Sequence, residues 1–91
     1  MLDKVKLALR ISHNLLDSDI KDTIDTARAE MIRSGVSEDV VDESNPLIES
    51  AIKTYCKAVY ANDEKKAEAF MNSWHYQLDN IRKSSMEESD D

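Results

Sequence analysis

Apolar residues recur along most of the chain at the three- and four-residue spacing that is typical of amphipathic helices. The predicted helices span about residues 3–9, 17–33, 46–61 and 64–83. The polar stretch that follows the first of them is predicted as a loop that supplies a helix cap, and residues 36–44 as a loop or one further helical turn. The pattern therefore predicts an all-α fold, a small bundle of four to five helices.

Residues with special backbone preferences mark the ends of these helices. Gly35, the only glycine, follows the second helix and suits a left-handed C-cap. Asn45 and Pro46 suit the N-cap and the first helical position of the third helix. Asn62 and Asp63 interrupt the pattern for only two residues, so the last two helices are predicted to form an antiparallel hairpin.

The apolar stripes of the three longer helices are expected to meet in one core. Trp74, on the last stripe, is expected to face the 46–61 helix near Tyr55. The predicted core residues are Ile20, Ile24, Ala27, Met31, Leu47, Ile48, Ala51, Ile52, Tyr55, Val59, Phe70, Trp74, Leu78 and Ile81.

Charge divides the chain into two parts. The sequence has 12 Lys and Arg against 19 Asp and Glu, a formal net charge of −7, which argues against binding to a nucleic-acid backbone. Residues 84–91 hold four carboxylates and no cation, so we expect a disordered acidic tail after a helical domain over residues 1–83. The carboxylates of the tail are candidates for docking to a partner: Glu87, Glu88, Asp90 and Asp91.

No set of residues predicts an active site, and we expect no enzyme activity, no cofactor and no metal. The acidic series after residue 16 lacks the glycine and the twelfth-position Glu of a calcium loop. His13 and His75 have no second His or Cys at ligand spacing, and Cys56 lies beside an apolar stripe, where a buried structural thiol is expected. No apolar run approaches the 18 residues of a membrane span.

The order of motifs resembles the small phage head–tail connector, or adaptor, family over nearly all of residues 2–82. The opening Val5-Lys6-Leu7-Ala8-Leu9-Arg10-Ile11 is similar to that family's VK-x-x-LRI start. The family's next pattern is D-x-x-I-x-x-A and ends in an aliphatic position. The residues of this chain that resemble it are Asp19-Ile20, Ile24, Ala27 and Ile32. The later blocks are Asn45-Pro46-Leu47-Ile48, Ala51-Ile52, Tyr55-Cys56-Lys57-Ala58-Val59-Tyr60, and the spaced Phe70, Trp74 and Leu78.

This resemblance implies a structural protein of the virion at the head–tail interface, present in the host cytoplasm during assembly. Such proteins form a ring, commonly of twelve copies, beneath the portal protein, extend the DNA exit channel and offer an attachment site for head-closure (stopper) or tail proteins. DNA would pass without specific binding, and acidic tails brought together in a ring would repel one another at low salt. One alternative is an acidic helical inhibitor or DNA mimic that binds a basic protein. Another, which the sequence disfavours, is a small metal-dependent hydrolase: Asp22 and Asp25 lie three apart on a helix, but the second pair, Asp39 and Asp42, lies in a weakly helical segment.

Overall fold

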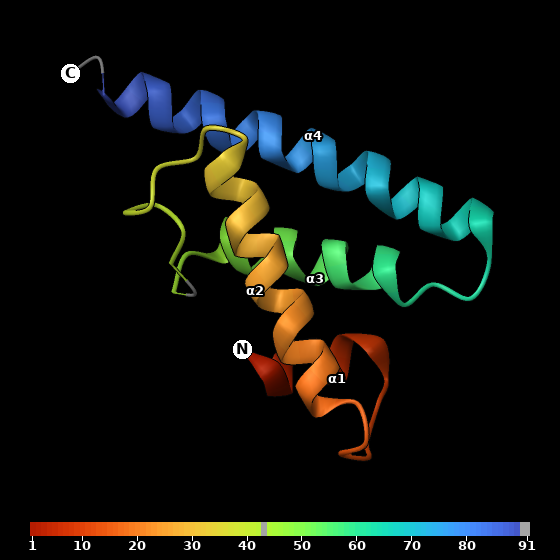
Figure 1. The fold of residues 1–91 in the computed structure, drawn as a ribbon. Helices are drawn as coiled ribbons and strands as arrows, with labels where there is room; N and C mark the ends of the chain where they lie inside the picture. Colours follow the sequence, from red (N-terminus) through yellow and green to blue (C-terminus); the bar gives the residue numbers. More distant parts are fainter. Residues whose placement is uncertain (43, 90–91) are drawn as a thin grey trace.

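A computed structural model describes residues 1–42 and 44–89, which form four helices and no strand (Figure 1). The helices are α1 (Leu2–Leu9), α2 (Asp17–Arg33), α3 (Pro46–Val59) and α4 (Glu64–Ser89). Residues 36–42 form turns rather than a further helix. The predicted all-α class is confirmed, with four helices in the part of the chain described.

The predicted helix ends are confirmed at three places. Asn45 is the N-cap of α3, where its Oδ1 accepts a hydrogen bond of 2.9 Å from the backbone N–H of Leu47. Asp63 Oδ1 accepts one of 2.8 Å from the N–H of Lys66 in the first turn of α4. Gly35 has a φ of 112°, in the region that favours glycine, and it turns the chain after α2.

The expectation that the loop before α2 supplies a side-chain cap was wrong. The N-cap position is Leu16, and no side chain makes a capping hydrogen bond there. Asp17 and Asp19 lie in the first turn instead, where carboxylates interact favourably with the positive end of the helix dipole.

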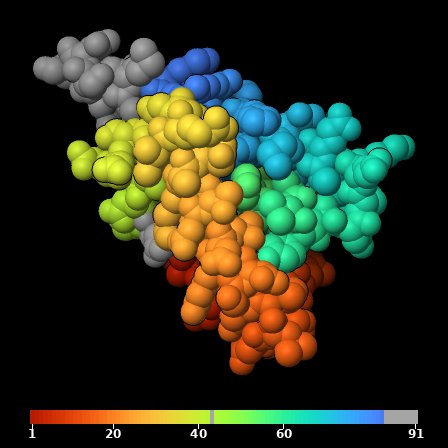
Figure 2. All heavy atoms as spheres, viewed as in Figure 1, coloured from red at the N-terminus to blue at the C-terminus, as the bar shows by residue number. Residues whose placement is uncertain are grey.

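Helices α3 and α4 form the predicted antiparallel hairpin, joined by a short connection (Figure 1). In Figure 1, α3 lies between α4 and α1, and α2 crosses in front of α3. Figure 2 shows that side chains of α2 cover much of α3 from this side. The α3–α4 turn and the C-terminal end of α4 lie at opposite ends of the molecule. None of the helices in the described residues is long and apolar enough to cross a membrane.

The core lies where α2, α3 and α4 meet, and Val5 of α1 and Val36 after α2 complete it. Trp74 is 2% exposed, and its ring centroid lies 4.9 Å from that of Tyr55 at an interplanar angle of 58°. The expected contact between Trp74 and Tyr55 is therefore confirmed. The predicted core residues that are buried are Ile20, Ile24, Ala27, Met31, Ile48, Ala51, Ile52, Trp74, Leu78 and Ile81.

Two predicted core residues are exposed. Leu47 is 57% exposed and Val59 is 49% exposed. They lie in the first and last turns of α3. The apolar residues of this helix extend over more of its surface than α1, α2 and α4 cover. Tyr55 and Phe70 are partly buried, and Lys57 Nζ lies 5.9 Å from the centroid of the Phe70 ring.

The helical backbone of α4 continues through Ser89, beyond the predicted end at residue 83. Met and Glu favour helices, and extending an existing helix is easier than starting one. Glu87 and Glu88 lie on this last part of α4, whereas Asp90 and Asp91 lie outside the described residues. The division into a 1–83 domain and an 84–91 tail stays a prediction.

Candidate functional site

The residues considered for catalysis are not brought together. Cys56 is fully buried, and desolvation raises the pKa of its thiol from 9.0 to about 11, so the nucleophilic thiolate is scarce near neutral pH. His13 and His75 are both exposed, on the loop before α2 and on α4. Among the described residues, neither imidazole forms a hydrogen bond with the thiol of Cys56. Cys56 and the two histidines therefore form no nucleophile–base pair in the described part of the chain.

The acidic series at the start of α2 is spread over the helix surface. Asp17 forms an ion pair with Lys6, with 2.8 Å between Oδ1 and Nζ, and Asp25 forms one with Arg28 at 3.3 Å. Asp19 and Asp22 are exposed on the same helix. No group of three or more His, Cys, Asp or Glu side chains in the described part of the chain is placed to hold a metal ion.

Lys6 is a buried charge that the sequence pattern did not predict. Its side chain is 11% exposed, and Nζ donates a hydrogen bond of 2.8 Å to Asn14 Oδ1 in addition to its ion pair with Asp17. A buried ammonium group requires such partners, because removing one of them leaves an uncompensated charge. Lys6 therefore fixes the loop between α1 and α2, which is a structural rather than a chemical role.

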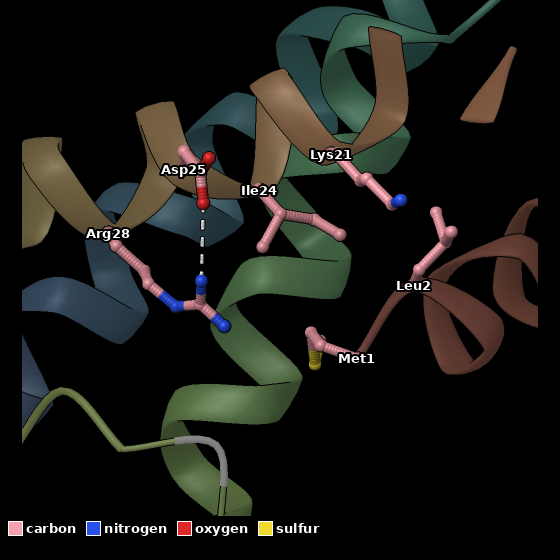
Figure 3. A pocket seen from close by; sticks show the side chains of 6 residues that line it. All are labelled: Met1, Leu2, Lys21, Ile24, Asp25 and Arg28. Atoms are coloured by element: carbon pink, nitrogen blue, oxygen red, sulfur yellow. Dashed lines mark hydrogen bonds and ion pairs between the residues drawn. The ribbon is translucent and has the colours of Figure 1, made fainter. Parts of the chain in front are cut away.

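A hollow lies between the N-terminal residues and one side of α2. In Figure 3, Met1 and Leu2 face the side chains of Lys21, Ile24, Asp25 and Arg28 across it. Met1 and Leu2 pack against the core, and the dashed line in Figure 3 marks the ion pair of Asp25 with Arg28. This hollow lies at the contact between α1 and α2, and its lining contains no Ser, Thr, Cys or His.

A longer depression follows the outer side of the α3–α4 hairpin, and we name it the α3–α4 furrow. It consists of three adjoining hollows: the first and second share Lys57 and Phe70, and the second and third share Gln77. Gln77 Nε2 donates a hydrogen bond of 3.1 Å to Ser50 Oγ and so joins the two helices across it. The residues that line the furrow are Ala8, Leu9, Arg10, Leu47, Ser50, Thr54, Lys57, Tyr60, Ala61, Asn62, Lys66, Phe70, Asn72, Ser73, Tyr76, Gln77, Asn80 and Ile81.

The furrow differs from the rest of this acidic chain because no carboxylate lines it. Its charged residues are Arg10, Lys57 and Lys66, at the end near the α3–α4 turn. None of these three cations forms an ion pair within residues 1–42 and 44–83. The apolar pattern of the sequence did not predict this surface. The signal lies in the helical register, which places residues 47, 50, 54 and 57 on one face of α3 and residues 66, 70, 73 and 77 on one face of α4.

The four most exposed large apolar side chains lie on two parts of the surface described by the structure. Tyr76, 70% exposed, and Leu47 belong to the furrow. Leu7, 81% exposed, lies on α1, and Leu15, 87% exposed, lies in the loop after it, on the other side of α3 from α4 (Figure 1). Exposed apolar side chains of this size are candidates for contacts with other proteins.

Comparison with known proteins agrees with a role in contacts between proteins. No curated protein and no solved structure shows a significant match to the chain. The sequence model of the family described as phage connector protein matches residues 1–88, which is nearly the whole chain and includes all four helices. The resemblance seen in the sequence motifs is thereby confirmed, and the chain belongs to the phage connector protein family.

Proposed function

We propose that this chain is the repeating subunit of a ring beneath the portal protein, where it extends the DNA exit channel and offers an attachment site for a head-closure or tail protein. The observation that carries this proposal is the family match over residues 1–88. Membership of the family makes the protein a structural phage connector. Our proposal adds the ring, its position beneath the portal and its attachment role.

The distribution of exposed apolar residues supports a ring. A closed ring of identical subunits needs two different complementary surfaces on each copy, because each copy contacts its neighbours head to tail. The surface around Leu7 and Leu15, on α1 and the loop after it, and the part of the furrow with Leu47 and Tyr76, on α3 and α4, are two different apolar surfaces that are available for such contacts. A C2 dimer would need only one self-complementary surface.

The charge of the chain supports passage of DNA rather than binding to it. With a net charge of −7, each copy adds negative potential to the wall of a channel. Such a wall repels phosphate groups at distances within about 8–10 Å at physiological ionic strength. DNA would therefore move through the ring without adhering to it.

Light scattering and electron microscopy of the purified protein, with and without a portal ring, test this proposal. We expect annular particles, at least when the portal is present. Leu7→Lys should reduce their formation, whereas Ala29→Lys, at an exposed position on α2, should leave it unchanged. A chain that stays monomeric at high concentration and with portal present would refute the ring, and capture of a strongly basic protein by that monomer would favour the inhibitor alternative.

A further inference from the structure

We infer that the α3–α4 furrow receives the acidic C-terminal segment, residues 84–91, of a neighbouring copy of this chain. The inference rests on the proposed ring and specifies what the furrow contacts in it. It follows from three features: the charge of the furrow, the charge of the segment, and the positions of the two along α4.

The furrow and the segment are complementary in charge. Arg10, Lys57 and Lys66 gather at one end of the furrow, have no ion pair in the described part of the chain, and face no carboxylate of the lining. Residues 84–91, with the sequence SSMEESDD, hold four carboxylates and no cation. The three cations of the furrow therefore have no ion-pair partner in the described part of the chain, and the segment supplies carboxylates without cations of its own.

The apolar part of the furrow fits the same occupant. Leu47 and Tyr76 are exposed along it and Phe70 is partly exposed, while its remaining lining is mostly uncharged Ser, Thr, Asn and Gln. Met86 is the single large apolar residue of the segment, directly before Glu87 and Glu88. A short peptide with one apolar side chain beside several carboxylates matches a groove with apolar side chains beside cations.

The segment of the same chain does not reach the cationic end of its own furrow. Lys66 lies in the first turns of α4, and the helix continues to Ser89. At a rise of 1.5 Å per residue, these positions are separated by about 35 Å along the helix axis. The two residues beyond Ser89 span at most about 7 Å. The occupant is therefore supplied by another copy.

Each copy then donates one segment and accepts one, so every contact is head to tail and a closed ring satisfies all of them. This arrangement reverses the expectation that the acidic tails of a ring repel one another. Tails that are each placed in a neighbour's cationic furrow lie apart and are neutralised in part. Added salt should weaken this contact, because it screens exposed charges.

Charge reversal in the full-length chain tests the inference. Lys66→Glu should lower the association constant of the ring at least tenfold, as measured by light scattering. The adjacent Lys65→Glu, an exposed lysine outside the furrow, should have little effect. Adding Glu87→Lys and Glu88→Lys to the Lys66→Glu chain should restore assembly. A Lys66→Glu protein that assembles as well as Lys65→Glu, or assembly that improves on neutralising Glu87 and Glu88, would overturn the inference.

A second measurement identifies the occupant directly. Carbodiimide joins carboxylates to lysines that they contact, so a ring of mixed ¹⁴N- and ¹⁵N-labelled copies should give mixed-isotope crosslinks between residues 84–91 and Lys57 or Lys66. Crosslinks within one copy only, or from the furrow to the portal protein instead, would contradict the inference while leaving the ring intact. Absence of any ring, with or without portal, would refute the proposed function and this inference together.

Discussion

Replacing Trp74 with Ala should remove a large part of the stability of the fold. The side chain is 2% exposed, and its ring packs 4.9 Å from that of Tyr55. Truncating a buried Trp to Ala typically costs about 3–5 kcal/mol, of which an aromatic pair accounts for about 0.5–1.5 kcal/mol. At about 0.05–0.15 kcal/mol per residue, a domain of this length has a total stability of about 5–14 kcal/mol. The substitution should therefore lower Tm by about 12–40 °C.

Thermal unfolding followed by circular dichroism, at a concentration where the protein is monomeric, measures this effect. Tyr76→Ala is the matched control: the side chain is also aromatic and on α4, but it is 70% exposed, and its loss should change stability by about 0.5 kcal/mol or less. A Trp74→Ala chain that melts within one or two degrees of the parent would show that the aromatic pair and the core around it contribute almost nothing, which would refute the packing described here.

Three further predictions concern other parts of the fold. Asn45→Ala should lower the free energy of unfolding in urea by about 0.5–2 kcal/mol, because the N–H of Leu47 loses its capping partner; Asn45→Asp, which keeps an acceptor, should restore it. Cys56 should react with an alkylating reagent at pH 8 only as fast as the fold opens, and rapid labelling of the folded protein would contradict its burial. The free energy of unfolding should fall as the pH rises from 9 toward 11, because burial raises the pKa of the thiol in the folded state. Cys56→Ala should show a smaller alkaline loss, and the part that remains includes Tyr55, whose pKa is also raised by burial. Hydrogen bonds from Lys4 and Lys53 hold the pKa of Glu49 below its ordinary 4.5, so the stability that these contacts contribute should be lost as the pH falls below 4.5 and through the lowered pKa. Urea unfolding at pH 3 and pH 7 should therefore show a smaller loss of stability in acid for Glu49→Gln than for the parent.

The helix order could be predicted because its signals are local. Asn45 and Pro46 start α3 by backbone geometry and side-chain capping, whatever surrounds them. Gly35 ends α2 in the same way. The contact of Trp74 with Tyr55 also follows from local information, since a short connection between the two helices brings their apolar stripes together.

Features that depend on several elements at once could not be predicted. Whether Leu47 and Val59 are covered is decided by where α1, α2 and α4 pack around α3, which the period of one helix does not contain. Burial of Lys6 requires that Asn14 and Asp17 return to it across a loop. The absence of carboxylates from the α3–α4 furrow becomes visible only when the faces of two helices are set side by side.

Arg82 joins α4 to the end of α2 and so fixes the direction of α4 relative to α2. Its Nη1 donates a hydrogen bond of 3.0 Å to the carbonyl of Ser34, and its guanidinium also pairs with Asp79. The helix continues beyond Arg82 to Ser89, so this contact fixes the direction in which the last part of α4 leaves the bundle. Ser89 lies about 10 Å further along the axis. In the proposed ring, the angle that this contact fixes between α4 and α2 would set the rotation from one copy to the next. That rotation determines how many copies close the ring.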